Sequence, residues 1–145
     1  MAFGDEVKAQ HYRNRAECFL RTMRLVSDES YLGDDLKDYI ASAPLLAVHA
    51  AIAFADAILV LKTGERSTAQ DHKEVIGKLR IVCGELKRDP SGLSQLSRLI
   101  ASKDHFAYGD RRITMTDIQS ARDQVDRFAT WVYRAFPELA TGDQT

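Results

Sequence analysis

The spacing of apolar residues along the chain follows the helical period of about 3.6 residues, and no segment alternates as a strand does. The pattern predicts helices over about Asp5–Ser27, Thr68–Lys87 and Leu93–Tyr108, and a last helix that Pro137 ends. We expect Tyr31–Tyr39 to be a connector, with or without a short helical turn.

A central segment is apolar on all sides, as the innermost helix of a bundle would be. It extends from about Pro44 to Lys62, and with its caps over about residues 43–63. Ser42 is a suitable N-cap residue, and Gly64 is suitable for the C-terminal end. Short connections favour antiparallel neighbours, so the predicted fold class is all-α, an antiparallel bundle of about five helices.

The C-terminal part of the chain carries signals for a helix start and for a tail. Thr116 and Gln119 predict a capping box at the beginning of the last helix. We expect residues 1–139 to form a single helical domain. Residues 140–145 are expected to form a mobile tail.

Charge and cysteine usage exclude some classes of protein. The 145 residues include 20 basic and 21 acidic side chains, so no global charge attracts a polyanion. Cys18 and Cys83 lack metal-ligand spacing, which favours reduced thiols in a cytoplasmic protein. The first residues do not resemble a signal peptide, and His49 and Asp56 interrupt the central apolar segment. We therefore expect a cytoplasmic protein with no membrane span and no cofactor.

Several polar residues occupy positions where the helical pattern calls for apolar ones. Lys103 falls in the middle of the apolar face of the fourth predicted helix, where an unpaired ammonium would be costly. On the central helix, Asp56, His49 and Ser42 follow one another at intervals of seven residues and form one polar row. His72 falls on the apolar side of the third predicted helix.

These positions allow two interpretations. In the first, His49, Asp56, His72 and Lys103 form a small polar ligand-binding pocket with Tyr108 at its mouth. In the second, they form a structural network in which Asp56 pairs with Lys103. His49 and Asp56 lie about 10 Å apart along the helix axis, too far to share one ion unaided, so no metal site is expected.

A basic turn precedes the last predicted helix. Tyr108 lies close to Arg111 and Arg112, with Lys103 about one turn upstream. An aromatic ring beside paired arginines is suited to hold a phosphate or to stack a base. The alternative is a solvated turn with two surface arginines, whose charge Asp110 dilutes.

Two features bear on self-association. Val7, Cys18 and Leu25 form a second, thinner apolar strip on the first predicted helix, which hints at a dimer contact. Trp131 lies off the main apolar stripe of the last helix, which indicates partial packing or a second dimer contact.

Two segments of the chain resemble HEPN domains. They are AVHAAIAFADAILVLKTGERSTAQDHKEVIGKL at residues 47–79 and LSRLIASKDHFAYGDRRIT at residues 96–114, followed by a long last helix. The similarity spans roughly Arg13–Phe136. It implies a helical bundle that is often dimeric. Many members are ribonucleases of toxin–antitoxin or defence systems, and others bind nucleotides or act as non-catalytic partners of nucleotidyltransferases.

The catalytic members of this family carry an Arg and then a His after four to six residues. Arg66 and His72 have five residues between them, and Arg98 and His105 have six. Arg98 and His105 are predicted on the polar side of the fourth helix, and Arg66 in the loop before the third. Both pairs are therefore only weak candidates for a catalytic motif.

The place of the family motif on the fourth helix is taken by the segment KDHFAY. Lys103 stands there in place of the Arg, and Tyr108 in place of the His. A lysine lacks the planar fork that grips a phosphate with two hydrogen bonds, and a tyrosine hydroxyl is a poor proton shuttle at neutral pH. The ribonuclease motif is therefore expected to be degenerate.

The sequence thus predicts a HEPN-like domain, expected to be a homodimer, that binds a nucleotide, RNA or a protein partner without cleaving RNA. The first alternative is a metal-independent, toxin-like ribonuclease that uses one of the two Arg–His pairs. The second is a purely structural interaction partner of a nucleotidyltransferase.

Overall fold

The computed structural model describes residues 5–27, 41–67, 72–109 and 112–141. Within these ranges the chain is helical and has no strands, so the predicted all-α bundle is confirmed. Most of the predicted connector Tyr31–Tyr39 and its flanks lies outside the described residues. The helices are α1 (Glu6–Val26), α4 (Ala43–Thr63), α5 (Lys73–Glu85), α6 (Leu93–Ala101), α7 (Lys103–Tyr108), α8 (Met115–Ala135) and α9 (Glu138–Thr141).

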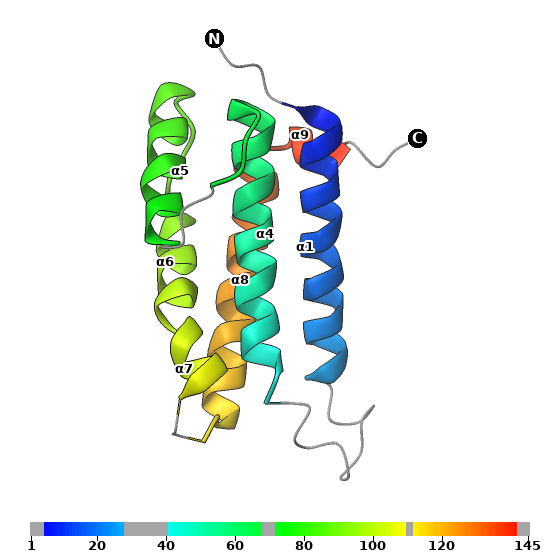
Figure 1. Cartoon of the computed structure of the whole chain (residues 1–145), viewed down its shortest axis with the longest axis vertical. Helices are drawn as coiled ribbons and strands as arrows, with labels where there is room; N and C mark the ends of the chain where they lie inside the picture. The colour runs from blue at the N-terminus through cyan, green and yellow to red at the C-terminus, as the bar shows by residue number, and fades with distance from the viewer. Residues whose placement is uncertain (1–4, 28–40, 68–71, 110–111, 142–145) are drawn as a thin grey trace.

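Helix α4 lies at the centre of the bundle. Figure 1 shows it between α1 on one side and α5 and α6 on the other, with α8 behind it. Its length and apolarity would allow it to cross a membrane, but 78% of its most apolar stretch is buried inside the fold. A helix covered on nearly all sides by its own chain is packed as the core helix of a bundle.

The two ends of α4 are only partly as predicted. Gly64 ends the helix in the left-handed conformation, with φ of 85°, where a glycine has no side chain to clash. Ser42 is the N-cap residue by position, but its hydroxyl makes no capping hydrogen bond. The reason is its helical backbone, with φ of −77° and ψ of −16°, whereas a capping serine needs an extended one.

The fourth predicted helix, Leu93–Tyr108, is wrong at one point, because the chain breaks it into α6 and α7 at Ser102. The Ser102 hydroxyl donates to the Arg98 carbonyl at 3.0 Å. The Ser102 amide donates to the carbonyls of both Arg98 and Leu99, at 3.2 Å each. A serine that binds the preceding turn competes with the regular helical ladder.

The predicted capping box of the last helix is misplaced by two residues. The N-cap is Thr114, whose hydroxyl accepts from the Asp117 amide at 3.1 Å. The Asp117 carboxylate in turn accepts from the Thr114 amide at 2.9 Å. Threonines 114 and 116 both precede a suitable partner by three residues, so the sequence pattern alone did not separate them.

Pro137 follows the end of α8, as predicted, but the chain continues into the short helix α9. Ala140 and Thr141, the first residues of the predicted tail, belong to α9, and residues 142–145 lie outside the described ranges. The Glu138 carboxylate holds α9 to the bundle through Lys62, at 2.5 Å, and Arg88, at 3.2 Å. Burial alone would raise the pKa of Glu138, but hydrogen bonds from Lys62, its own backbone and Arg88 lower it to about 2.

Trp131 is part of the core, so the interpretation of a partly packed residue or dimer contact is wrong. Its side chain is 2% exposed, and its indole N–H donates to the Asp89 carbonyl at 2.8 Å. The ring packs directly on Gly92, at the start of α6: a β-carbon at Gly92 would lie 2.1 Å from the Trp131 ring. Gly92 therefore allows α6 and α8 to approach each other.

We predict that Gly92→Ala lowers the free energy of unfolding by about 1–3 kcal/mol, because the new methyl group has to displace a rigid, buried indole. Urea denaturation followed by circular dichroism measures this change.

Gly77→Ala is the matched control. Gly77 lies in the middle of α5, and no atom lies within 4 Å of the position of its absent β-carbon. Because alanine is the better helix former, this variant should be more stable than wild type by roughly 0.5–1 kcal/mol. Equal effects of the two variants would contradict the close contact at Trp131.

Candidate functional site

Three basic side chains from different elements meet on the polar edge of α4. His49 of α4 is half-buried, and its ring stacks on Phe19 of α1 with the ring centroids 5.4 Å apart. His72, the N-cap residue of α5, places its Nε2 atom 3.4 Å from the Lys103 ammonium at the start of α7. We call His49, His72 and Lys103 the basic cluster.

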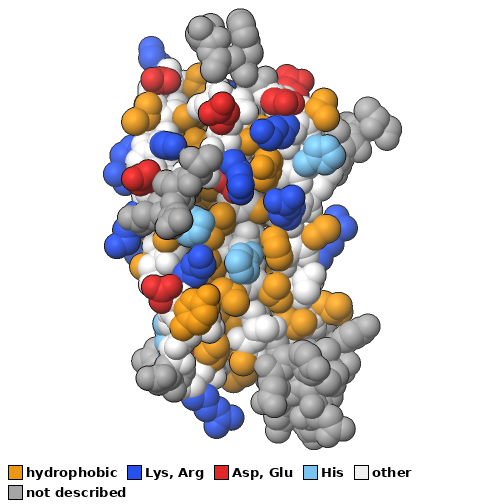
Figure 2. All heavy atoms as spheres, in the orientation of Figure 1, with side chains coloured by type: hydrophobic (Ala, Val, Ile, Leu, Met, Phe, Trp, Pro, Cys, Tyr) orange, Lys and Arg blue, Asp and Glu red, His pale blue; other side chains and the backbone are white. Residues whose placement is uncertain are grey.

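The electrostatics of the basic cluster disfavour a further positive charge. Burial lowers the pKa of His49, and the positive charges of Lys103 and His72 lower it further. His49 is therefore neutral at neutral pH, and it would gain a proton more readily beside an anion. Figure 2 shows this face, on which histidine and basic side chains lie close together among apolar ones.

Asp56 does not pair with Lys103, so that expectation is wrong. The Asp56 side chain is buried, with 9% exposure, and the cations that act on it are Arg66, after α4, and Arg15 of α1. The separation of seven positions between His49 and Asp56 corresponds to about 10 Å along α4, so a lysine beside His49 is too far from Asp56 to pair with it. The predicted polar row of α4 is therefore divided. His49 lies near His72 and Lys103, whereas Asp56 lies near Arg66 and Arg15.

Asp56 keeps an unusual protonation equilibrium. Burial raises the pKa of its carboxyl group to about 6, although the charges of Arg66 and Arg15 act in the opposite direction. Two nearby guanidinium groups thus do not fully compensate for the loss of water around the carboxylate.

Tyr108 and Arg112 are the residues of the predicted basic turn that the structure describes. Tyr108, the last residue of α7, is 82% exposed, and in the described part of the chain it makes no hydrogen bond or ring contact with the basic cluster. Arg112 is exposed as well, and Arg111 lies outside the described residues. Tyr108 therefore does not close a pocket over His49.

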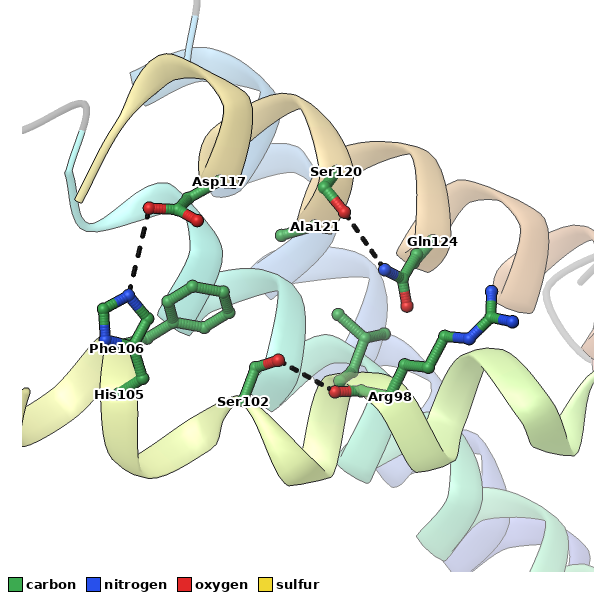
Figure 3. Close-up of a pocket in the computed structure, with 9 residues that line it drawn as sticks. Arg98, Ser102, His105, Phe106, Asp117, Ser120, Ala121 and Gln124 are labelled. Atoms are coloured by element: carbon green, nitrogen blue, oxygen red, sulfur yellow. Dashed lines mark hydrogen bonds and ion pairs between the residues drawn. The ribbon is translucent and has the colours of Figure 1, made fainter.

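A second polar site lies between α6, α7 and the first half of α8. It is a pocket of about 130 Å³, and Figure 3 shows the side chains that line it. Arg98 and His105, which the sequence paired as a weak catalytic motif, both belong to this lining. The lining residues are Arg98, Leu99, Ser102, His105, Phe106, Asp117, Ser120, Ala121 and Gln124.

Arg98 and His105 face different ends of this pocket. The Nε2 atom of His105 lies 3.9 Å from the Asp117 carboxylate, and a β-carbon at Gly109 would lie 2.7 Å from its Nδ1 atom. In Figure 3 the His105 ring turns towards Asp117, whereas the Arg98 side chain extends towards the opposite end. The two side chains share a pocket but do not converge on one point.

The two residues of the other Arg–His pair have different neighbours. Arg66 acts on the Asp56 carboxylate, and His72 contacts Lys103. Neither pair therefore forms a compact catalytic arrangement within one copy of the chain. In the part of the chain that the structure describes, no three His, Cys, Asp or Glu side chains are placed to hold a metal ion.

Sequence reasoning missed Arg15, Asp117 and Gln124 as residues of these sites. Arg15 lies four residues before Phe19, so a prediction that α1 packs beside α4 would have placed it near Asp56. Asp117 and Gln124 lie seven residues apart on one face of α8, which marks a polar line next to the apolar stripe. This polar line acquires neighbours only through the packing of α8 against α6, which the sequence does not show.

Comparisons with known proteins identify no relative of this chain. A scan of family models, a search of curated proteins and a search of solved structures each found no match to this chain.

We predict that Asp56→Asn stabilises the protein at neutral pH, because asparagine resembles the protonated acid that burial favours. The pKa of Asp56 is raised from 3.8 to about 6, so its stabilising contribution is complete below about pH 3.8 and is lost as pH rises through 6. Relative to wild type, the variant should gain roughly 2–3 kcal/mol at pH 7 and nothing at pH 3.5.

Urea denaturation of both proteins between pH 3.5 and pH 8 measures this difference. A variant that is less stable than wild type at pH 7 would show that the arginines, rather than burial, dominate the environment of Asp56.

Proposed function

We propose that this chain is a HEPN-like helical domain that binds the phosphate groups of a nucleotide or of RNA at the basic cluster and does not cleave RNA. The observation that carries the proposal is the 3.4 Å approach of the Lys103 ammonium to the His72 ring, next to His49. The Lys103 ammonium donates to the His72 ring nitrogen beside the half-buried His49. A phosphate at this point would accept hydrogen bonds from Lys103 and, once they are protonated, from the two imidazoles.

The chemistry of the cluster suits a phosphate better than a neutral ligand. Lysine and protonated histidine donate charge-assisted hydrogen bonds to phosphate oxygens. His49 has its pKa lowered by burial, Lys103 and His72, and a nearby dianion would raise it again. Binding should therefore take up a proton and strengthen as pH falls from 8 to 6.

The positions of Tyr108, His105 and Arg66 support binding without cleavage. Tyr108, which occupies the motif position of the catalytic His, points into solvent, and a tyrosine is a poor proton shuttle at neutral pH. His105 turns towards Asp117, and Arg66 towards Asp56, so neither Arg–His pair shares a target. The HEPN resemblance supports the same class of function, since its non-catalytic members bind nucleotides.

The remaining parts of the proposal concern assembly and location. We place the protein in the cytoplasm, as a homodimer that is able to act beside a nucleotidyltransferase in a toxin–antitoxin system. The apolar strip on α1 supports the dimer: Val7 is 73% exposed, Leu25 is 47% exposed, and Cys18 is exposed between them. Residues 7, 18 and 25 share one face of α1.

We predict that Lys103→Met and His72→Gln each weaken binding of a fluorescein-labelled single-stranded oligoribonucleotide and of ATP by roughly tenfold or more. Fluorescence anisotropy measures the first ligand and isothermal titration calorimetry the second. The affinity for the oligoribonucleotide should also fall as salt rises, because phosphate contacts release counterions.

Lys78→Met provides the control, since Lys78 is an exposed lysine on α5 whose removal changes the net charge equally. Equal losses in Lys78→Met and Lys103→Met would reduce the interaction to non-specific charge. Cleavage of the RNA that His72→Ala or His105→Ala abolishes would establish the ribonuclease alternative instead.

We predict that replacing both Val7 and Leu25 by lysine converts the dimer into a monomer, because charged side chains cannot be buried in an apolar contact. Size-exclusion chromatography with light scattering gives the mass directly. Ile81→Lys, at a 61% exposed position on α5, is the control and should leave the dimer intact. A wild-type mass of one chain would contradict the dimer.

A further inference from the structure

The pocket between α6, α7 and α8 is a site separate from the basic cluster. Lys103 and His105 lie two residues apart on α7 and face different neighbours. Lys103 contacts His72 on the α5 side, whereas His105 faces Asp117 on α8. A ligand in the pocket would therefore not compete with a phosphate bound at the basic cluster.

Gln124 gives this pocket an acceptor without a donor. Its side-chain nitrogen donates to the Ser120 hydroxyl at 3.1 Å, which anchors the amide group. Its Oε1 atom is buried, and among the described residues it has no hydrogen-bond partner. Figure 3 shows this oxygen directed towards the space between α8 and α6. A buried carbonyl oxygen without a donor is unfavourable, so a ligand hydroxyl or amine that reaches it is favoured.

Arg98 supplies a cation to the lining of the same pocket. Its side chain is exposed on α6, and within the described ranges its guanidinium group takes part in no ion pair. The Ser102 hydroxyl, which binds the Arg98 carbonyl, holds the turn of α6 that carries this side chain. A guanidinium group binds a phosphate or carboxylate with two parallel hydrogen bonds.

The rest of the lining suits a hydroxyl-rich molecule. The Ser120 hydroxyl accepts from Gln124, so its own hydrogen is available for a ligand oxygen. The Asp117 carboxylate at the far end is an acceptor for hydroxyl groups, and it also orients His105. Leu99, Phe106 and Ala121 form an apolar floor, against which the carbon side of a sugar ring packs well.

We propose that this pocket binds a small sugar phosphate. The phosphate lies against the Arg98 guanidinium group, and a sugar hydroxyl donates to Gln124 Oε1. Ser120 and Asp117 contact further hydroxyl groups. The proposal combines the two unmatched groups of the pocket: the cation receives an anion, and the buried acceptor receives a donor.

The test uses the full chain with three probes, ribose 5-phosphate, ribose and inorganic phosphate. Titration followed by ¹⁵N–¹H NMR should show saturable binding of ribose 5-phosphate, with shifts of the Gln124 side-chain amide. Ribose and phosphate, which each satisfy one half of the site, should bind at least tenfold more weakly. Equal affinity for ribose 5-phosphate and inorganic phosphate would overturn the proposal, as would absence of binding.

Variants separate this site from a general charge effect. Arg98→Ala and Gln124→Leu should each weaken ribose 5-phosphate binding at least tenfold. Gln124→Leu should also raise the melting temperature, because it removes an unmatched buried acceptor, and so it reports that the fold is intact. Arg80→Ala, an exposed arginine on α5, should leave the affinity unchanged. Binding that survives both pocket substitutions would refute the site.

Discussion

Helix α4 is apolar on all sides except one narrow edge, and the arrangement of the other helices follows from the need to cover it. Its residues from Ala47 to Val60 are almost all buried, and alanine is the commonest among them. Small side chains let neighbouring helices approach closely, so α1 runs antiparallel along α4 over nearly its whole length (Figure 1). The Asp5 amide donates to the Val60 carbonyl at 3.0 Å and ties the beginning of α1 to the last turns of α4.

The same constraint explains where polar chemistry gathers. A buried helix cannot accommodate a polar side chain unless a neighbour provides a partner, so His49 and Asp56 each draw groups from α1 and from beyond α4. The arrangement is a compromise, because burial still raises the pKa of Asp56 and lowers that of His49. Their shifted protonation equilibria are the consequence of a core helix with a narrow polar edge.

The short helix α7 carries side chains of both sites. Lys103, its first residue, contacts His72 at the start of α5, and His105, two residues later, faces Asp117 of α8. One short segment therefore contributes to two sites on different sides of the bundle. The two sites have different chemistry: the basic cluster joins an ammonium group to two imidazole rings, whereas the α6–α8 pocket combines an arginine with a buried acceptor.

Sequence alone was sufficient for the long helices α1, α4 and α8, because the period and density of apolar positions report which parts of a helix are buried. It determined the position of α4, the glycine at its end and the presence of polar residues on its edge. It did not determine their partners: Asp56 was assigned to Lys103, although Arg15 and Arg66 are its neighbours. Partners depend on how helices are placed around one another, and helical periodicity carries no information about that placement. The break at Ser102, the burial of Trp131 on Gly92 and the unmatched oxygen of Gln124 are therefore features that only the tertiary structure decided.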